Sequence, residues 1–423
     1  MAKYLVERSG PLVGEVAISG AKNAVLPILA ATVLTKEPCE IYDVPQLRDV
    51  DVMCRILRAL GARVDEDPKE HTIVVEAAEI TDTEIPYEFM KQMRASIFLM
   101  GPLLARMGSA VMSMPGGCAI GNRPIDLHNK GLKALGAKIL QDDDSVEAIA
   151  RKLTGNKVYL DFPSVGATEN IMMAATLAEG TTVIENAAEE PEIVDLANFL
   201  NKMGARIRGA GTDNIRIEGV ASLHGTRHAV IPDRIETGTF MVAAAITRGD
   251  LLLVNSVPDH VRPVIAKLGE CGVVINDEVD GLRIRGDLKK LRATDIKTLP
   301  YPGFPTDMQA PFMAFLTTVQ GSSTVIETVF ENRFMHADEL NRMGANIRVE
   351  DRTAYVPGDK NVLSGASVIA TDLRAGAALV LAGLVAEGHT EVANVHLVER
   401  GYENFVDKLT AIGGKIRKVE DVA

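Results

Sequence analysis

The segment Met114–His128, which reads MPGGCAIGNRPIDLH, is the part of the chain best suited to chemistry. Cys118 stands among one proline and three glycines, a context typical of an exposed loop. Arg123 follows five residues later, and a thiol near a cation can act as acid, base or nucleophile. No His or Asp lies at a protease-like local spacing. The segment therefore predicts a lid suited to proton transfer beside a bound anion.

Basic residues stand where four of six apolar stretches begin. They are Lys22, Arg94, Arg234 and Arg374. A cation at a helix N-terminus opposes the helix dipole and costs about 0.3–1 kcal/mol. Ordinary capping explains polar residues such as Thr306 and Thr371, which we assign as N-caps. Capping does not explain four cations at equivalent places, which indicate an anion site at helix starts.

The elements that position these residues form a repeat of 68 to 75 residues. An amphipathic stretch ends in a glycine and runs into a β-branched strand, as in LRALGARV at 57–64. The six glycines are at positions 61, 136, 204, 272, 344 and 413. Glycine ends a helix readily because it accepts the left-handed backbone of a C-cap. The sequence therefore predicts one supersecondary unit that is used six times.

Each unit also contains an apolar helix ahead of the amphipathic one. These stretches are 24–34, 95–105, 170–178, 238–246, 310–319 and 375–386. A helix that is apolar on all faces must be surrounded by protein. Strand-like runs follow some of them, at 181–187, 250–257 and 323–330. We expect an α/β fold with the apolar helices inside and the sheets outside.

A chain of 423 residues is too long for one comfortable core, so two domains of three units each are expected. We predict one domain at 22–230, which carries the cysteine lid. The other comprises 1–21 and 231–423. Short crossings are expected near 20–22 and 227–232, with the six helix N-termini facing the cleft between the domains.

Composition limits the function classes. The start MAKYLVERSG has no apolar signal region, and no apolar run reaches about 18 residues, so a soluble cytoplasmic protein is expected. The net charge of −12 argues against nucleic acid as a partner. The cysteines at 39, 54, 118 and 271 form no CxxC pair and no zinc spacing. Cys54 and Cys271 are expected to be buried hydrophobes.

Several motifs in order resemble the UDP-N-acetylglucosamine enolpyruvyltransferases (1-carboxyvinyltransferases). The motifs are GAKNA (20–24), PGGCAIGNRP (115–124), SVGATEN (164–170), PDRIETGTF (232–240), FPTDMQ (304–309), FENRFMH (330–336), TDLRAG (371–376) and LVERGYENF (397–405). The resemblance implies two inside-out α/β barrels, each made of three repeated units with pseudo-threefold symmetry, and no metal or organic cofactor. It also implies the first committed step of peptidoglycan synthesis.

The resemblance implies roles for single residues in a reaction that joins the sugar's 3-hydroxyl to carbon 2 of phosphoenolpyruvate and expels phosphate. Cys118 matches the proton donor, which can also form an adduct with phosphoenolpyruvate and is attacked by the epoxide fosfomycin. Asp307 matches the acceptor of the hydroxyl proton, and an N-cap role is its structural alternative. The matches to groups that bind phosphoenolpyruvate are Lys22, Asn23, Arg123 and Arg400; Lys22 and Arg400 also count as catalytic.

For the sugar nucleotide, the matching residues are Asn23, Arg94, Arg123, Pro124, Ile125, Asp126, Leu127, Ser164, Val165, Gly166, Asp307 and Val329. Pro124, Ile125 and Leu127 offer an apolar wall for a uracil ring. Supporting positions are Arg48, Asp233, Arg234, Glu331, Arg333, Asp372 and Arg374. Two positions depart from some members: Phe162-Pro163 replaces Lys-Val, and Arg48 replaces Lys.

Two alternatives stay open. The shikimate-pathway enolpyruvyltransferase shares the fold and phosphoenolpyruvate, but it lacks the PGGC loop and the uridine-site motifs. A non-catalytic sugar-nucleotide sensor could retain the site. The presence together of Lys22, Cys118, Asp307 and Arg400 argues against a decayed site.

Overall fold

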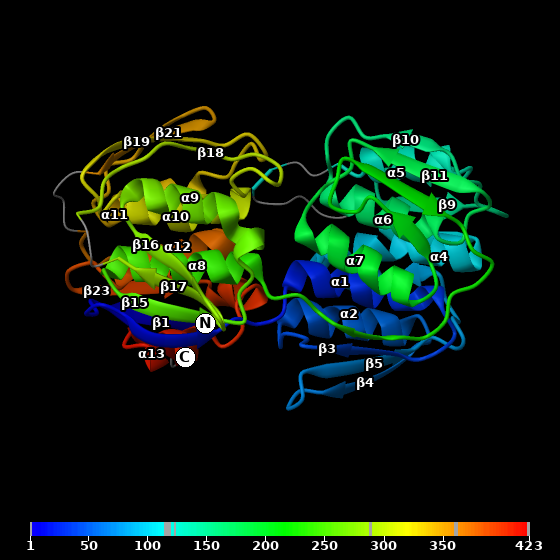
Figure 1. Cartoon of the computed structure of the whole chain (residues 1–423), viewed down its shortest axis with the longest axis horizontal. Coiled ribbons are helices and arrows are strands. Elements are labelled where there is room, and N and C mark those ends of the chain that lie inside the picture. Colours follow the sequence, from blue (N-terminus) through cyan, green and yellow to red (C-terminus); the bar gives the residue numbers. More distant parts are fainter. Residues whose placement is uncertain (1, 114–119, 122–123, 287–289, 359–362, 421–423) are drawn as a thin grey trace. The chain divides into compact units, whose positions relative to one another are not determined.

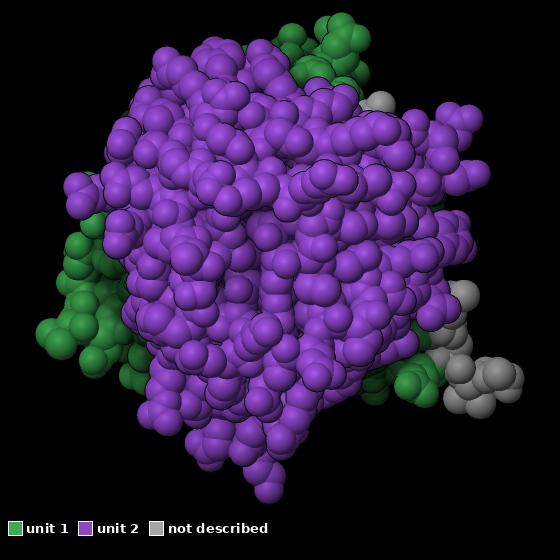
Figure 2. Space-filling view, turned by 90° about the vertical axis from the view of Figure 1, so that its right-hand side faces the viewer, with its two compact units in different colours: residues 1–19, 118–122, 232–423 green, residues 20–117, 123–231 purple. Residues whose placement is uncertain are grey.

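The computed structural model describes residues 2–113, 120–121, 124–286, 290–358 and 363–420. These residues form two compact units (Figure 2). Unit 1 comprises the described residues of 1–19, 118–122 and 232–423, and unit 2 comprises those of 20–117 and 123–231. The division at 22–230 that the sequence suggests stays a prediction.

Six four-stranded sheets share one pattern within the described chain. An edge strand runs parallel to its neighbour, and the other two pairings are antiparallel, as in β10, β11, β13 and β12. The sheets of unit 2 are β14 (Arg227–Ala229), β3 (Cys39–Tyr42), β5 (Thr72–Glu76) and β4 (Arg63–Asp67); β6 (Glu84–Ile85), β7 (Ser109–Ser113), β9 (Ser145–Ile149) and β8 (Lys138–Gln141); and β10 (Lys157–Tyr159), β11 (Thr181–Glu185), β13 (Asn214–Glu218) and β12 (Arg206–Arg208).

The sheets of unit 1 repeat this order. They are β2 (Val13–Ala17), β15 (Asp250–Val254), β17 (Gly281–Arg285) and β16 (Val274–Glu278); β18 (Ile296–Lys297), β19 (Gly321–Ile326), β21 (Thr353–Gly358) and β20 (Arg348–Glu350); and β22 (Ser367–Ile369), β23 (His389–Ala393), β1 (Ala2–Glu7) and β24 (Lys415–Glu420).

The chain start completes the sixth sheet. Strand β1 lies between β23 and β24, with Tyr4 opposite both Val392 and Lys418. Two edge strands also pair with strands far along the chain. Strand β2, just before the chain passes into unit 2, pairs with β15 of its own unit 1. Strand β14, just before the chain returns to unit 1, pairs with β3 of its own unit 2.

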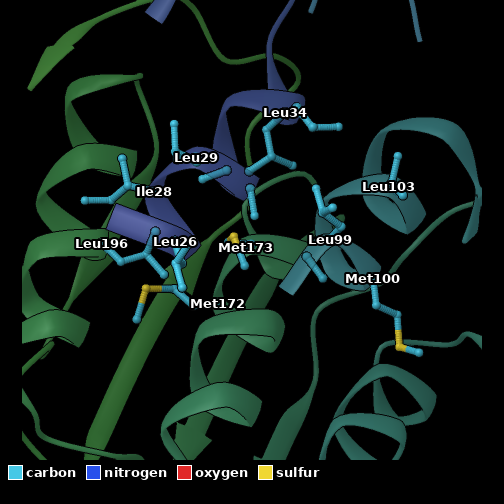
Figure 3. Close-up of a cluster of buried hydrophobic side chains, with 14 of the residues drawn as sticks. Leu26, Ile28, Leu29, Leu34, Leu99, Met100, Leu103, Met172, Met173 and Leu196 are labelled. Carbon is cyan, nitrogen blue, oxygen red and sulfur yellow. The ribbon is translucent and has the colours of Figure 1, made fainter. Parts of the chain in front are cut away.

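The apolar helices lie inside the sheets of each unit, as the sequence predicts (Figure 1). In α10 every residue from Gln309 to Leu316 is buried. In unit 2, Leu26, Leu99 and Met173 belong to the cluster that fills the space between these helices (Figure 3). The inner helices are α1 (Lys22–Ala31), α4 (Met100–Met107) and α6 (Val165–Ala175) in unit 2, and α8 (Arg234–Thr247), α10 (Gln309–Leu316) and α12 (Leu373–Gly383) in unit 1.

Short 3₁₀ turns extend several elements. They are η1 (Thr32–Leu34), η2 (Arg94–Leu99), η3 (Pro258–Val261), η4 (Thr306–Met308) and η5 (Val395–Arg400), and a further helix, α3 (Tyr87–Gln92), precedes η2. Among the described residues, no helix has both the length and the apolar character needed to cross a bilayer.

The amphipathic helices end as predicted. They are α2 (Arg48–Ala59), α5 (Asp126–Ala134), α7 (Pro191–Lys202), α9 (Arg262–Cys271), α11 (Met335–Arg342) and α13 (Phe405–Ala411). The repeat glycine that follows each helix has φ between 92° and 103°, the left-handed region that glycine accepts at little cost. Cys54 and Cys271 are buried in α2 and α9, as expected, and Cys39 is buried in β3.

One carboxyl group is sealed inside unit 2. Glu169 of α6 is fully buried, and neither of its oxygens has a hydrogen-bond partner within the described chain. Burial, and then the charges of Glu192 and Glu190, raise the pKa of Glu169 well above its usual value. A carboxyl group whose pKa is higher in the folded state than in the unfolded state lowers the free energy of unfolding as the pH rises above the unfolded-state pKa.

The backbone conformation at the repeat glycine predicts opposite effects for two alanine substitutions. A Cβ atom added at Gly344 or at Gly269 would have no other atom within 4 Å, but Gly344 has a φ of 92° and Gly269 lies inside α9. Gly344→Ala should lower stability by about 1–2 kcal/mol through strain alone. Gly269→Ala should raise it by about 0.5–1 kcal/mol. Thermal and urea unfolding would measure both changes, and equal shifts of the two variants would contradict the assignment.

The raised pKa of Glu169 predicts a pH-dependent gain from Glu169→Gln. Below the unfolded pKa of about 4.3 both states hold the proton and the charge costs nothing. As pH rises above that value, the folded state of the wild type is increasingly penalised, so the gain in Tm for Glu169→Gln should grow from pH 5 to pH 8. The exposed Asp143→Asn is the matched charge control. A gain that is constant with pH would show that Glu169 is not destabilising through its ionisation.

Candidate active site

In unit 1, two buried arginines hold the carboxylate of Asp307. Arg333 Nη2 donates to Asp307 Oδ1 at 2.7 Å. Arg374 lies 3.0 Å from Oδ2 through Nη2, and its Nε also donates to Oδ2 at 3.1 Å. The arginine side chains are 3% and 1% exposed, whereas that of Asp307 is 28% exposed. Both arginines therefore fix the Asp307 carboxylate, which stays partly exposed.

A second carboxylate orders the segment around Asp307. Glu327 is almost fully buried and accepts hydrogen bonds from the hydroxyl of Thr306 at 2.9 Å and from the amide of Val329 at 2.8 Å. Arg333 Nη1 donates to the same Thr306 hydroxyl at 3.0 Å. Val329, a predicted sugar-nucleotide contact, is thus held by the group that also supports the Asp307 turn.

The capping assignments made from the sequence are wrong for two residues. Helix α12 is capped by Asp372, whose Oδ1 accepts from the amides of Arg374 and Ala375, and not by Thr371. Thr306 is the first residue of η4, and its hydroxyl donates to Glu327 where an N-cap would accept. A carboxylate is the stronger acceptor for first-turn amides, and it lies one residue further along. Asp307 likewise caps neither η4 nor α10 and pairs with arginines.

Arg374 is also stacked on an aromatic ring. Its guanidinium lies 5.1 Å from the centre of the Tyr402 ring, and the Tyr402 hydroxyl is 2.9 Å from that of Thr239 in α8. Burial alone would lower the pKa of Arg374, but Tyr402, Asp307 and Asp233 more than offset this and raise it. Burial raises the pKa of Tyr402. Arg374 therefore stays a cation despite its position in the core.

Of the remaining predicted residues of unit 1, three lie at helix ends and Glu331 lies in a turn. Asp233 caps α8, and Arg234, its first residue, lies 5.6 Å from the centre of the Tyr301 ring. Arg400 is the half-buried last residue of η5. Glu331 is exposed, 3.7 Å from Arg352.

The described residues nearest to Cys118 in sequence contact this region of unit 1. The amide of Asn332 donates to the carbonyl of Ile120 at 3.1 Å. A Cβ atom on Gly121 would lie 2.3 Å from a carboxylate oxygen of Glu331, and the φ of Gly121 is 146°. A side chain at position 121 would therefore require both a strained backbone and a shift of the Glu331 side chain. Cys118 and Arg123 themselves lie outside the described residues.

In unit 2, Lys22 and Asp49 form an ion pair at two helix starts. Lys22 is the first residue of α1, and its Nζ lies 3.3 Å from Asp49 Oδ2 in the first turn of α2. The two side chains are 12% and 5% exposed. Asn23 follows on α1 and is half-buried, while Arg48 begins α2 and is exposed. Lys22 thus keeps a charge partner at the position expected to bind an anion.

The N-terminus of α6 gathers another predicted group. Ser164 caps the helix and accepts from the amide of Ala167 at 3.3 Å. Val165 and Gly166 form the first turn, and the buried imidazole of His128 from α5 lies against Gly166. Arg94, at the start of η2, lowers the pKa of that imidazole through its charge, in addition to the larger effect of burial.

The residues expected to line a uracil site differ in accessibility. Pro124 and Asp126 are exposed and Leu127 is half-buried, but Ile125 is 4% exposed and belongs to the core of unit 2. The apolar wall proposed from the sequence stays a prediction.

Several supporting residues were given no role of their own from the sequence. Asp49, His128, Asn170, Glu327 and Tyr402 each contact a predicted residue or its helix. An acid in a first helical turn or a tyrosine near a helix is ordinary, so only the fold reveals their partners.

Comparisons with known proteins show similarity over nearly the whole chain. Residues 6–409 match the family model of EPSP synthase (3-phosphoshikimate 1-carboxyvinyltransferase). UDP-N-acetylglucosamine 1-carboxyvinyltransferase 1 of Caldanaerobacter subterraneus subsp. tengcongensis is 62% identical over 414 residues, which cover 98% of this chain and 99% of the relative. UDP-N-acetylglucosamine 1-carboxyvinyltransferase 2 of Carboxydothermus hydrogenoformans is 59% identical over 422 residues, covering 100% of both chains.

Solved structures share the fold. The enolpyruvyl transferase NikO of Streptomyces tendae matches with a TM-score of 0.89 at 26% identity, covering 99% of both chains. EPSP synthase of Acinetobacter baumannii matches with a TM-score of 0.77 at 18% identity, covering 99% of this chain and 100% of that one. The expected α/β fold and the resemblance noted in the motifs are both confirmed. The chain belongs to the enolpyruvyltransferase family, within the group of UDP-N-acetylglucosamine 1-carboxyvinyltransferases.

Proposed function

We propose that the chain transfers the enolpyruvyl group of phosphoenolpyruvate to the 3-hydroxyl of UDP-N-acetylglucosamine and releases phosphate, the first committed step of peptidoglycan synthesis. The observation that carries this proposal is the 62% identity over 98% of the chain to a relative named for this reaction. The ordered Asp307 carboxylate, held by Arg333 and Arg374, supports it.

The reaction proceeds by addition and then elimination. The hydroxyl oxygen bonds to carbon 2 of phosphoenolpyruvate while carbon 3 gains a proton, which we assign to the Cys118 thiol. The hydroxyl proton passes toward the open edge of Asp307. Carbon 3 then loses a proton as the bond from carbon 2 to the phosphate oxygen breaks. Phosphate leaves, and the product is an enol ether of the sugar nucleotide.

The anionic groups of phosphoenolpyruvate need several cations. We assign Lys22, Arg123 and Arg400 to its phosphate and carboxylate, because arginine binds such groups through paired hydrogen bonds. Asn23 contributes a neutral donor beside Lys22. The Asp49 partner of Lys22 keeps the ammonium at the start of α1 before the substrate binds.

The sugar nucleotide is assigned to the start of α6 and to residues 124–127, and Asp307 and Val329 are further assigned contacts. We propose a cytoplasmic enzyme that acts on small molecules and has neither a nucleic acid nor a membrane as partner. The three cysteines of the described chain are free thiols, as is usual in a reducing compartment.

A phosphate-release assay tests the substrate. Phosphate should appear from phosphoenolpyruvate when UDP-N-acetylglucosamine is present, and not when shikimate 3-phosphate replaces it. Release with shikimate 3-phosphate alone would make the chain a functional EPSP synthase. Tight binding of the sugar nucleotide without release in any mixture would make it a sensor.

Substitution of Cys118 tests proton donation. Cys118→Ser should lose about a hundredfold or more in turnover, because a hydroxyl is a poor proton donor at neutral pH. Cys118→Asp should keep turnover and resist alkylation by an epoxide, since a carboxylic acid donates a proton but is a weak nucleophile. Cys271→Ala, at a buried thiol whose pKa burial raises to about 12, is the control and should behave as wild type. A folded but inactive Cys118→Asp would show that the reaction needs the nucleophilic thiol.

A further inference from the structure

His128 is a buried imidazole that the assignments above do not use. It is the third residue of α5 and is 7% exposed. Asn170 of α6 contacts it, with Asn170 Nδ2 3.0 Å from His128 Nδ1. The orientation of this amide decides which imidazole nitrogen carries the proton.

Two backbone groups fix the amide of Asn170. Its Oδ1 accepts from the amide of Gly101 at 2.6 Å, and its Nδ2 donates to the carbonyl of Ile97 at 2.7 Å. A flipped amide would place Nδ2 against an N–H and Oδ1 against a carbonyl, which are two repulsive contacts. The second N–H of Nδ2 therefore points at His128, and Nδ1 of the imidazole must accept it.

The ring proton is then on Nε2. A nitrogen that accepts a hydrogen bond carries a lone pair, so the neutral imidazole of His128 keeps its proton on the other nitrogen. Burial, and then the charge of Arg94, lower the pKa of His128 to about 4. The side chain is thus a neutral donor at neutral pH and not a cation.

This donor lies at the first turn of α6. A Cβ atom built on Gly166 would be 3.3 Å from Cε1 and 3.4 Å from Nε2 of His128. The amides of Val165 and Gly166 belong to that turn, where a helix has no carbonyl of its own to satisfy them. Within the described residues, Nε2 donates no hydrogen bond. A donor that no described residue uses, on a side chain that is 7% exposed, therefore lies beside the amides of a helix N-terminus, a place that favours an anionic oxygen.

We propose that Nε2–H of His128 donates a hydrogen bond to a diphosphate oxygen of the nucleotide bound at the start of α6, and that Asn170 is the positioning residue that fixes this tautomer. The proposal rests on the proposed function, which supplies the sugar nucleotide as ligand. A neutral donor avoids a second charge beside Arg94. It also makes binding insensitive to pH over the range in which a free histidine titrates.

Calorimetric titration of the full chain with UDP-N-acetylglucosamine and with UDP tests the contact. His128→Leu should weaken both ligands by about tenfold to a hundredfold, the loss of a hydrogen bond to a charged group. His128→Gln, whose amide nitrogen can replace Nε2–H, should recover most of the affinity. Lys130→Met removes an exposed cation two residues along α5, paired with Asp161, and should change neither affinity.

The tautomer of His128 can be measured separately from its packing, because a side chain that only fills space has no required tautomer. Nitrogen-15 NMR of the free protein should show His128 protonated on Nε2 and unprotonated on Nδ1 from pH 5.5 to pH 8, with a flat nucleotide affinity over that range. In the variant Asn170→Asp, the new carboxylate can only accept a hydrogen bond. It should therefore favour a proton on Nδ1 of His128 and so the imidazolium form, and the nucleotide affinity should then depend on pH.

Three results would overturn the proposal. They are an unchanged affinity in folded His128→Leu, a proton on Nδ1 in the wild type, and a loss seen with UDP-N-acetylglucosamine but not with UDP, which would place His128 at the sugar. If the wild type turns over UDP-N-acetylglucosamine, such a result refutes this contact and leaves the proposed function intact. If the wild type neither binds nor converts it, the proposed function fails first.

Discussion

A helix that is buried on every side can present polar groups only at its ends, and this constraint decides where the chain carries its chemistry. Helix α10 has no exposed residue, and α6, α8 and α12 are nearly as closed. Their first-turn amides still need acceptors. Side chains from neighbouring elements therefore gather at these starts, as the His128 side chain of α5 does at the start of α6.

The two units meet this constraint with different chemistry. In unit 1, Arg333 and Arg374 are almost fully buried, so each needs an anion, and Asp307 serves both. Loss of Asp307 would remove the carboxylate that both buried arginines contact, a change that usually costs several kcal/mol. The carboxylate is therefore fixed before any ligand binds, and preorganised groups of this kind need no rearrangement during the reaction. The start of α6 in unit 2 instead uses neutral groups, Asn170 and His128, whose orientation is set by backbone hydrogen bonds.

The sequence predicts the repeat well because it repeats a physical requirement. All six helix-ending glycines have left-handed φ, and each apolar stretch overlaps a buried helix. The pattern could not reveal that β1 completes the sixth sheet or that β2 and β14 pair outside their own repeat, because strand pairing leaves no local signal. It also assigned the α12 cap to Thr371, one residue before Asp372, since both types favour that position. Partners such as Asp49 for Lys22 depend on tertiary contacts and appear only in the structure.

The same constraint explains how one fold accepts different substrates. A solved EPSP synthase with 18% identity shares this fold, so the core tolerates wide replacement of its apolar residues. A change at a helix start alters a ligand contact but leaves the buried helix behind it intact. We therefore propose that the choice of acceptor resides in first turns and adjoining loops. In this chain those positions include Ser164, Val165 and Gly166, where the lack of a side chain on Gly166 leaves room for the His128 ring. A bulkier residue there would displace the His128 ring from the helix start.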